Sequence, residues 1–408
     1  MGTYVPNTPE EQREMLAVCG MTDLEQLYDC IPEDVRLRKP LAIPAAASEY
    51  EVTRQVAALA GKNHVFSTCL RGAGAYRHYI PAIVTEVTGK EEFRTAYTPY
   101  QAEISQGVLQ SIFEYQTDIA ELTGMAVSNA GVYDGATAAA EACEMCCDRK
   151  RTAVLVSSTV DPKVLSVIRT YRFGRDAEVR LVPDVDGVTD LEALKEMLTD
   201  DVACLVLQQP NFYGCLEDAD AAAALVHEAK AKLIMSCNPV ALALIKTPGE
   251  CGADIAVGEG QPLGLPLGFG GPYLGFMATD EKLMRKLPGR IVGQTEDRNG
   301  ERCYVLTLQA REQHIRREKA SSNICSNEAL CALTASVYLA AMGPQGLAQV
   351  ANACRDKAHY LKDRLTEAGL KPVFAKPFFH EFVTEARSLA LARSPCQRSQ
   401  LGDSLFGE

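Results

Sequence analysis

The residues best suited to chemistry gather in one polar and aromatic stretch, residues 97–107, which reads YTPYQAEISQG. Its Tyr97, Tyr100 and Gln101 carry hydroxyl and amide groups that form hydrogen bonds without adding charge. A predicted helix follows directly, and the first N–H groups of a helix have no partner within it, so they attract a phosphate or a carboxylate. The stretch therefore predicts part of a pocket for an anionic molecule, with a solvated or packed polar loop as the alternative.

A second candidate lies in residues 71–78, which read RGAGAYRH and combine glycines with polar side chains. Arg71 and Arg77 each offer a guanidinium group, which binds carboxylates and phosphates through paired hydrogen bonds. His78 differs from the other five histidines only through these neighbours, because no two histidines have the spacing of metal ligands. We expect Arg71, Arg77 and His78 to line an interface or a substrate pocket; a purely structural role for each is the alternative.

Other familiar motifs are weak or absent. Cys143, Cys146 and Cys147 lack the second pair of ligands that a zinc site needs, and they lie in an alanine-rich helical pattern, so we interpret them as buried thiols and predict no metal site. The chain has neither a G-x-G-x-x-G after a strand nor a G-x-x-x-x-G-K-[ST] loop, which disfavours a nicotinamide-binding fold and a P-loop NTPase. The loop 268–272, GFGGP, either approaches a ligand closely or makes a tight turn.

The composition is that of an ordinary globular protein. The 408 residues are 47% hydrophobic and 23% charged, which is enough apolar material for a large core. The formal net charge of -12, without a long basic run, disfavours binding to nucleic acid or to a membrane surface. The fifteen cysteines are scattered through apolar stretches, as in reduced proteins, and no apolar run is long enough to cross a membrane. We therefore expect a cytoplasmic protein.

The hydrophobic pattern changes along the chain from helical spacing to short apolar runs separated by helices. Continuous apolar strands that alternate with helices are typical of a parallel or mostly parallel sheet covered on both faces. We predict an N-terminal arm with short helices over residues 1–95, a large α/β domain over 96–326 and a small C-terminal domain over 327–408. The predicted strands are residues 153–156, 179–182, 204–207, 233–235, 254–257 and 273–277.

Three long ungapped stretches carry a resemblance to a known family: CLRGAGAYRHYIPAIV (69–84), YTPYQAEISQGVLQSIFEYQTDIAELTGM (97–125) and GEGQPLGLPLGFGGPYLGF (258–276). Up to about Val383, the chain resembles subunit 1 of the two-subunit glycine decarboxylase, the P-protein of the glycine cleavage system. The resemblance implies a pyridoxal-phosphate transferase of the aspartate aminotransferase type, fold type I. This α/β fold has a mostly parallel seven-stranded sheet in a large domain and a smaller C-terminal α+β domain. The residues after Val383 depart from the family pattern, so we expect an incomplete small domain.

In this family glycine is decarboxylated on pyridoxal phosphate, and its aminomethyl group passes to the lipoyl arm of H-protein. Such an enzyme holds the cofactor through a Schiff-base lysine and an aspartate beside the pyridinium nitrogen. The matching stretch Gly258–Gly271 contains no lysine, with Gln261 and Pro262 near its place, and residues 237–239, Cys-Asn-Pro, stand where the aspartate is expected. We therefore predict the half of the enzyme without a Schiff-base lysine and without a catalytic residue of its own, the cofactor being bound covalently by the partner subunit.

The resemblance also implies the partners: a lysine-bearing subunit 2, with two copies of each subunit, lipoylated H-protein and glycine. In this fold the active sites lie between subunits, so the loops Arg71–His78 and Tyr97–Gln106 are candidates to complete the partner's pocket. The leading hypothesis is a glycine dehydrogenase (aminomethyl-transferring, decarboxylating) that works as part of a heteromer. The alternatives are a structural subunit that only stabilises its partner and a free-standing pyridoxal enzyme, against which the missing lysine argues.

Overall fold

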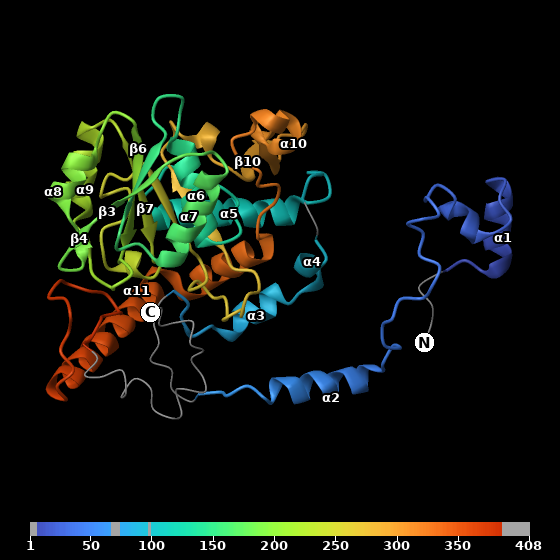
Figure 1. The fold of residues 1–408 in the computed structure, drawn as a ribbon, viewed down its shortest axis with the longest axis horizontal. Helices are drawn as coiled ribbons and strands as arrows, with labels where there is room; N and C mark the ends of the chain where they lie inside the picture. Colours follow the sequence, from blue (N-terminus) through green and yellow to red (C-terminus); the bar gives the residue numbers. More distant parts are fainter. Residues whose placement is uncertain (1–5, 67–73, 97–98, 386–408) are drawn as a thin grey trace. The chain divides into compact units, whose positions relative to one another are not determined.

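The computed structural model describes residues 6–66, 74–96 and 99–385, and Figure 1 shows its fold. The chain divides into two compact units, Met1–Leu70 and Arg71–Glu408. The division into 1–95, 96–326 and 327–408 stays a prediction.

The first unit consists of short, well-capped helices with almost no core. Each helix begins at a capping box, in which an N-cap side chain and the side chain three residues later bond backbone N–H groups of the helix start. Among residues 6–66, Leu16 is the only buried apolar side chain. Local signals thus specify these helices, whereas the packing that normally stabilises a helix is missing from the unit itself. The helices are α1 (Pro9–Val18), the 3-10 helix η1 (Leu24–Tyr28) and α2 (Glu49–Ala60).

The second unit is built on a seven-stranded, mostly parallel sheet, which confirms the predicted fold class. Its strand order is β1-β9-β8-β7-β6-β2-β3, and only β9 runs antiparallel to its neighbours. Each predicted apolar run forms one of these strands, and the structure adds the short β1. The strands are β1 (Val127–Ser128), β2 (Ala153–Ser157), β3 (Val179–Val182), β6 (Val202–Gln209), β7 (Lys232–Cys237), β8 (Ile255–Glu259) and β9 (Gly275–Thr279).

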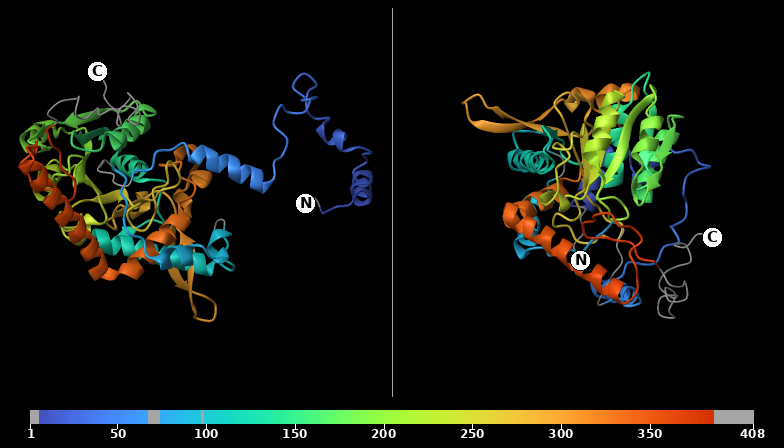
Figure 2. Two further views of the ribbon diagram at one scale, coloured as in Figure 1. Left: turned by 90° about the horizontal axis from the view of Figure 1, so that it is seen from below. Right: turned by 90° about the vertical axis from the view of Figure 1, so that its left-hand side faces the viewer.

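Helices cover both faces of this sheet (Figure 2). They are α5 (Gln106–Thr123), α6 (Gly135–Cys146), α7 (Pro162–Phe173), α8 (Leu191–Met197), α9 (Ala219–Glu228) and α11 (Ala329–Glu367). Successive strand residues point to opposite faces: Leu155 of β2 packs in the core cluster with α5, α8, α9 and α11, and Val154 packs in the cluster with α6 and α7. Cys143 and Cys146 lie in the second cluster, and the described residues hold no group of His, Cys, Asp or Glu that could bind a metal ion.

The long helix α11 bends sharply at Gly343 and Pro344, because Gly343 leaves the helical conformation with φ 61 and proline cannot continue the hydrogen-bond ladder. Its first half is packed into the core through Ala332, Ala335 and Tyr338. In the described part of the chain, α11 is the one helix long and apolar enough to cross a membrane, a test that core helices also pass.

The remaining elements are short. The β10–β11 hairpin projects away from the sheet (Figure 2), and α5 packs against it. These elements are α3 (Ala82–Thr88), α4 (Glu91–Arg94), β4 (Asp184–Val185), β5 (Val188–Thr189), β10 (Ile291–Glu296), β11 (Arg302–Thr307), α10 (Gln313–Arg316) and the 3-10 turns η2 (Ala241–Ala243), η3 (Met284–Lys286), η4 (Gln309–Arg311) and η5 (Arg317–Lys319).

Candidate functional site

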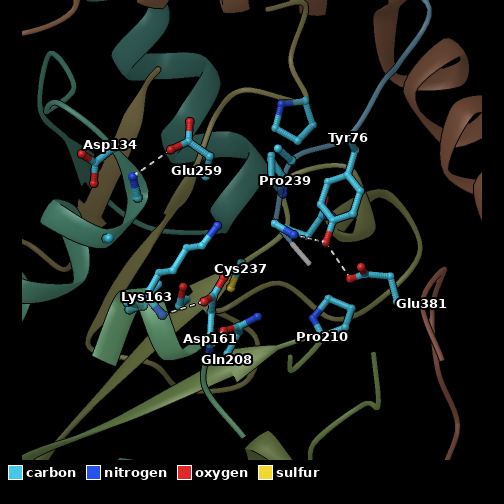
Figure 3. A pocket seen from close by; sticks show the side chains of 18 of the residues that line it. Tyr76, Asp134, Asp161, Lys163, Gln208, Pro210, Cys237, Pro239, Glu259 and Glu381 are labelled. Atoms are coloured by element: carbon cyan, nitrogen blue, oxygen red, sulfur yellow. Dashed lines mark hydrogen bonds between the residues drawn. The ribbon is translucent and has the colours of Figure 1, made fainter. Parts of the chain in front are cut away.

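The carboxyl ends of the parallel strands border a cavity of about 360 Å³ (Figure 3). This edge of an open α/β sheet is where ligands usually bind. Strand β6 brings Gln208 to the cavity, β7 brings Ser236 and β8 brings Glu259. Asp134 and Asp161 add two carboxylates from the starts of α6 and α7.

Asp134 and Asp161 reach the cavity because each is the N-cap residue of its helix. Oδ1 of Asp134 accepts a hydrogen bond from the Thr137 N–H at 2.7 Å, and Oδ1 of Asp161 accepts one from the Lys163 N–H at 2.8 Å. Oδ2 of each aspartate makes no hydrogen bond with the described residues. The Lys163 side chain extends into the same cavity and forms no ion pair with any described carboxylate (Figure 3).

Glu259, the last residue of β8, accepts a hydrogen bond from the first residue of α6. Its Oε2 accepts a hydrogen bond from the Gly135 N–H at 3.0 Å, and its Oε1 accepts from the N–H groups of Gln261 and Leu274, each at 3.0 Å. Burial raises the pKa of Glu259 to about 7, although these three backbone donors favour the ionised carboxylate. A carboxylate of the chain itself therefore meets the helix terminus that would otherwise attract an external anion.

Gln261 and Pro262, near the position of the family's lysine, both lie at this site. The buried Gln261 side chain donates from Nε2 to the carbonyl oxygens of Tyr76 at 3.0 Å and Leu265 at 2.8 Å, and its Oε1 accepts from the Tyr76 N–H at 3.3 Å. Pro262 lines the cavity. Gln261 thus holds the backbone of Tyr76 at the mouth of the cavity.

Tyr76 also meets the segment that follows α11. Its hydroxyl donates a hydrogen bond to Oε2 of Glu381 at 2.6 Å, and its ring contacts the His380 ring edge-on at 4.9 Å between centroids. Nε2 of His78 and both ring nitrogens of His380 are buried without a hydrogen-bond partner among the residues that the structure describes. Burial lowers the pKa of both histidines to about 4, so both rings are neutral near pH 7.

Of the other predicted site residues, those that the structure describes do not line the cavity. Arg71 and Tyr97 lie outside the described residues. Arg77 and Gln101 are exposed, and their side chains make no hydrogen bond with the described part of the chain. Tyr100 is half exposed and lies against Arg290. Their predicted role in a partner's pocket stays a prediction.

Arg290, which contacts Tyr100, is a buried charge that forms no ion pair with any described carboxylate. The Arg290 guanidinium stacks on the Tyr100 ring at 4.1 Å from its centroid, and its Nη2 donates to the Tyr100 hydroxyl and to the Cys325 carbonyl. Arg290 is only 1% exposed, yet its Nε and Nη1 have no hydrogen-bond partner within the described part of the chain. Such a group is costly to bury unless an anion compensates it.

The charged residues of the cavity were not predicted from the sequence; they are Asp134, Asp161, Lys163, Glu259 and Glu381. A signal for one of them was present: Asp161 precedes a proline at the start of a predicted helix and follows a predicted strand, which is the pattern of an N-cap at the carboxyl edge of a sheet. Glu381 could not be found this way, because the contacts of its segment are distant in sequence: Phe378 pairs with Cys215, and Tyr76 bonds Glu381 itself.

The buried histidines make stability depend on pH in a defined direction. The pKa of His380 is about 4 in the folded chain and 6.5 when unperturbed, so the unfolded chain takes up the proton first and stability is lost as the pH falls from 6.5 towards 4. Between about pH 7 and about pH 5 this loss is roughly 2 kcal/mol for His380. In urea unfolding, His380→Gln is expected to show a pH dependence smaller by that amount, whereas exposed His314→Gln keeps the full dependence. An equal pH dependence in the unmodified chain and His380→Gln would contradict the buried neutral ring.

A family model and two relatives of high sequence identity indicate the family of this chain. A family model described as glycine cleavage system P-protein matches residues 2–399. A relative from Moorella thermoacetica is named probable glycine dehydrogenase (decarboxylating) subunit 1; it is 56% identical over 387 residues, which are 94% of this chain and 87% of the relative. A relative of the same name from Carboxydothermus hydrogenoformans is 51% identical over 388 residues, again 94% of this chain and 87% of the relative.

Solved structures agree with these relatives. An inhibitor-bound glycine decarboxylase (P-protein) of the glycine cleavage system superposes with a TM-score of 0.89 at 44% identity, over 95% of this chain and 88% of that one. An aspartate aminotransferase from Thermus thermophilus, 17% identical, shares the fold with a TM-score of 0.52 over 73% of this chain and 77% of that one. The fold is therefore that of the pyridoxal-phosphate enzymes of fold type I, and the chain belongs to the glycine cleavage system P-protein family.

Proposed function

We propose that this chain is the glycine decarboxylase subunit that has no Schiff-base lysine, and that it acts on glycine only in a heteromer with a lysine-bearing subunit 2. The observation that carries the proposal is the role of Gln261, which stands near the family's lysine position but is fully engaged with backbone groups of Tyr76 and Leu265. A glutamine carboxamide, unlike a lysine amine, forms no Schiff base with an aldehyde, and its hydrogen bonds give this side chain a structural role instead.

The other residues of the cavity also suit the cofactor poorly. Pyridoxal phosphate supplies an electron sink for loss of carbon dioxide from glycine, and it needs an anion beside its ring nitrogen and donors for its phosphate. Asn238 and Pro239 follow β7 and supply no anion. The Glu259 carboxylate occupies the N–H group of Gly135 at the start of α6 and would repel a phosphate there. We therefore derive no step on this chain through the cofactor and assign the cofactor to the partner.

The proposal predicts that the isolated chain binds no pyridoxal phosphate covalently, because no lysine lies between Gly258 and Gly271. The expected visible spectrum, recorded with excess cofactor, shows no band that borohydride removes, and a reducible band that maps to any lysine of this chain would contradict the prediction. Co-purification with a lysine-bearing subunit 2 should restore both the band, on the partner, and exchange of bicarbonate carbon into glycine. An isolated chain that catalyses the exchange at the rate of the mixture would overturn the proposal.

The first unit favours a heteromer, because its helices form from local signals but bury almost no apolar side chain within the unit. Sixteen large apolar side chains between residues 15 and 66 are exposed, and a single one, Leu16, is buried among those described. A segment of this size without a core is not stable alone. We propose that its apolar side chains pack on subunit 2. The exposed residues of α2 are Tyr50, Val52, Val56 and Leu59.

The uncompensated Arg290 supports a contribution of the Tyr100 loop to the partner's active site. The guanidinium group of Arg290 stacks on the ring of Tyr100. Tyr100 belongs to residues 97–107, the stretch for which the sequence predicts part of a pocket for an anionic molecule. We propose that this loop, with Arg71, Arg77 and His78, meets an anionic group of the partner's site, where the aminomethyl group of glycine passes to the lipoyl arm of H-protein. We also propose that the heteromer contains two copies of each subunit and is located in the cytoplasm.

Replacing Tyr100 by Phe is expected to leave assembly intact, because the change removes one hydroxyl and almost no volume. The exchange rate should fall about tenfold if this hydroxyl meets the reacting groups, since about 1.4 kcal/mol of transition-state stabilisation equals one decade. Gln101→Ala tests the neighbouring side chain, and Tyr360→Phe, at an exposed site on α11, is the matched control. If Tyr100→Phe and Gln101→Ala both assemble and exchange at the unmodified rate, the structural-subunit alternative takes the lead.

A further inference from the structure

The segment of residues 74–80 begins at the cavity, and its residues after Gly74 form neither helix nor strand. The exposure of its side chains alternates from residue to residue, as in an extended chain. The segment therefore has an inward face, which packs on the fold, and an outward face. The partly buried inward residues are Tyr76, His78 and Ile80, and the exposed outward residues include Arg77 and Tyr79.

Gln261 binds this segment at a single residue. Its Nε2 donates to the Tyr76 carbonyl oxygen at 3.0 Å and its Oε1 accepts from the Tyr76 N–H at 3.3 Å, so one carboxamide pairs with both backbone groups of Tyr76. A segment outside any sheet has no strand to pair with these groups, and backbone groups that are buried without a partner are costly. A lysine at position 261 could only donate, so it would leave the Tyr76 N–H without this acceptor.

Tyr76 is bound a second time, through its side chain (Figure 3). Its hydroxyl donates to Oε2 of Glu381 at 2.6 Å and accepts from the Gly74 N–H at 3.1 Å. Two separate parts of the chain, the loop after β8 and the segment after α11, thus fix the position of Tyr76. Because successive residues of an extended chain face opposite sides, fixing Tyr76 inward directs its neighbour Arg77 outward.

We propose that Gln261 is a positioning residue of the heteromer, which fixes the backbone of Tyr76 so that the extended segment presents Arg77 to subunit 2. Arginine and tyrosine are enriched where proteins meet, and a guanidinium group in a fixed orientation forms paired hydrogen bonds with a carboxylate or a phosphate. Arg77 is exposed and forms no hydrogen bond with the described residues. The choice of subunit 2 rests on the proposed function, in which Arg77 meets an anionic group of the partner's site.

The first measurement is trypsin cleavage after Arg77 in the full chain without subunit 2. A protease cuts a bond only when the residues around it leave their packed positions, so an exposed arginine on a fixed segment is cleaved slowly. Gln261→Met keeps the length of the side chain and removes both hydrogen bonds to Tyr76. We expect the cleavage rate of this variant to rise at least about tenfold, because the open form of the segment becomes more populated.

Gln116→Met is the matched control. The buried Gln116 of α5 pairs in the same way with both backbone groups of Val292, its Nε2 donating at 3.0 Å and its Oε1 accepting at 2.9 Å. We expect this control to lose a similar amount of stability in urea unfolding and to leave cleavage after Arg77 unchanged. Tyr76→Phe removes one hydroxyl and almost no volume, so it should fold and should also accelerate cleavage. Circular dichroism establishes that each variant is folded.

The second measurement separates positioning from assembly in the heteromer. Exchange of bicarbonate carbon into glycine is measured with each variant chain in saturating excess over subunit 2, so that weaker assembly does not limit the rate. We expect kcat/KM to fall at least about tenfold for Gln261→Met and for Arg77→Gln. The double variant should fall no further than Arg77→Gln alone, because the carboxamide acts through the guanidinium group.

Three results would overturn the proposal. The first is cleavage after Arg77 that neither Gln261→Met nor Tyr76→Phe accelerates. The second is an unmodified exchange rate of Gln261→Met at saturation, which would leave Gln261 a purely structural role. The third is a double variant in which the losses of Gln261→Met and Arg77→Gln multiply, since the two residues would then act independently. Absence of exchange in the unmodified mixture would overturn the proposed function and the choice of partner, whereas cleavage alone decides whether Gln261 fixes the segment.

Discussion

A chain that begins at Arg71 is expected to fold but not to assemble with subunit 2. Deletion of residues 1–70 removes the first compact unit, while the seven-stranded sheet and both of its core clusters lie entirely beyond it. The exposed apolar side chains of the deleted unit are the ones we propose to be buried on the partner. Size-exclusion chromatography should show the truncated chain eluting alone, and exchange of bicarbonate carbon into glycine should fall to background.

A narrower change separates the apolar contact from the loss of the whole arm. Val52, Val56 and Leu59 share one face of α2 and are all exposed. Replacing the three by serine should weaken assembly by at least about 3 kcal/mol, more than a hundredfold in the dissociation constant. Thr53→Ser with Gln55→Ser, on the same helix, is the control. Assembly of the triple-serine chain at the unmodified affinity would show that α2 does not pack on the partner.

Glu259→Ala is expected to destabilise the second unit by about 3 kcal/mol, because it leaves three backbone N–H groups around the cavity without their acceptor. The substitution also removes a buried carboxyl group whose pKa is raised to about 7. This gain offsets part of the free energy that is lost with the three hydrogen bonds. Water that enters the cavity is expected to restore some of the bonds. Urea unfolding at about pH 8, where the carboxylate is ionised, measures the difference.

Two further variants test whether the hydrogen bonds of Glu259 are the cause. Glu259→Gln keeps one acceptor oxygen and should lose roughly 1 kcal/mol. Glu141→Gln is the matched control, because burial raises the pKa of Glu141 to about 7 as well, but no described backbone N–H group bonds its carboxylate. We expect Glu141→Gln to be neutral or stabilising at the same pH. If Glu259→Ala is as stable as the unmodified chain, these three hydrogen bonds do not hold the cavity together.

The sheet could be predicted from the sequence because its strands are buried on both faces. A strand such as β6 must then be apolar at nearly every position, which distinguishes it from the helices on either side. The short β1 escaped this reasoning, since Val127 and Ser128 are too few residues to show a period. The capped starts of α1 and α2 were also visible, because a capping box is a local pattern of two side chains.

The missing lysine was likewise visible in the sequence alone, because an absence between Gly258 and Gly271 needs no coordinates. What replaces it was decided by tertiary structure. Gln261 bonds Tyr76, which is 185 residues away, and Tyr76 bonds Glu381, which is 305 residues away. No local pattern encodes contacts of that separation.

The long separation of contacting residues along the chain also explains why the candidate site could not be predicted from the sequence. The sequence shows that no lysine lies between Gly258 and Gly271, and it predicts helices that begin near Asp134 and Asp161. Only the packing of α6 and α7 on one face of the sheet brings those two carboxylates, Lys163 and Glu259 around a single cavity. Charged residues that follow different strands meet at one cavity because the sheet aligns the carboxyl ends of those strands. That alignment is a property of the fold and not of any single stretch of sequence.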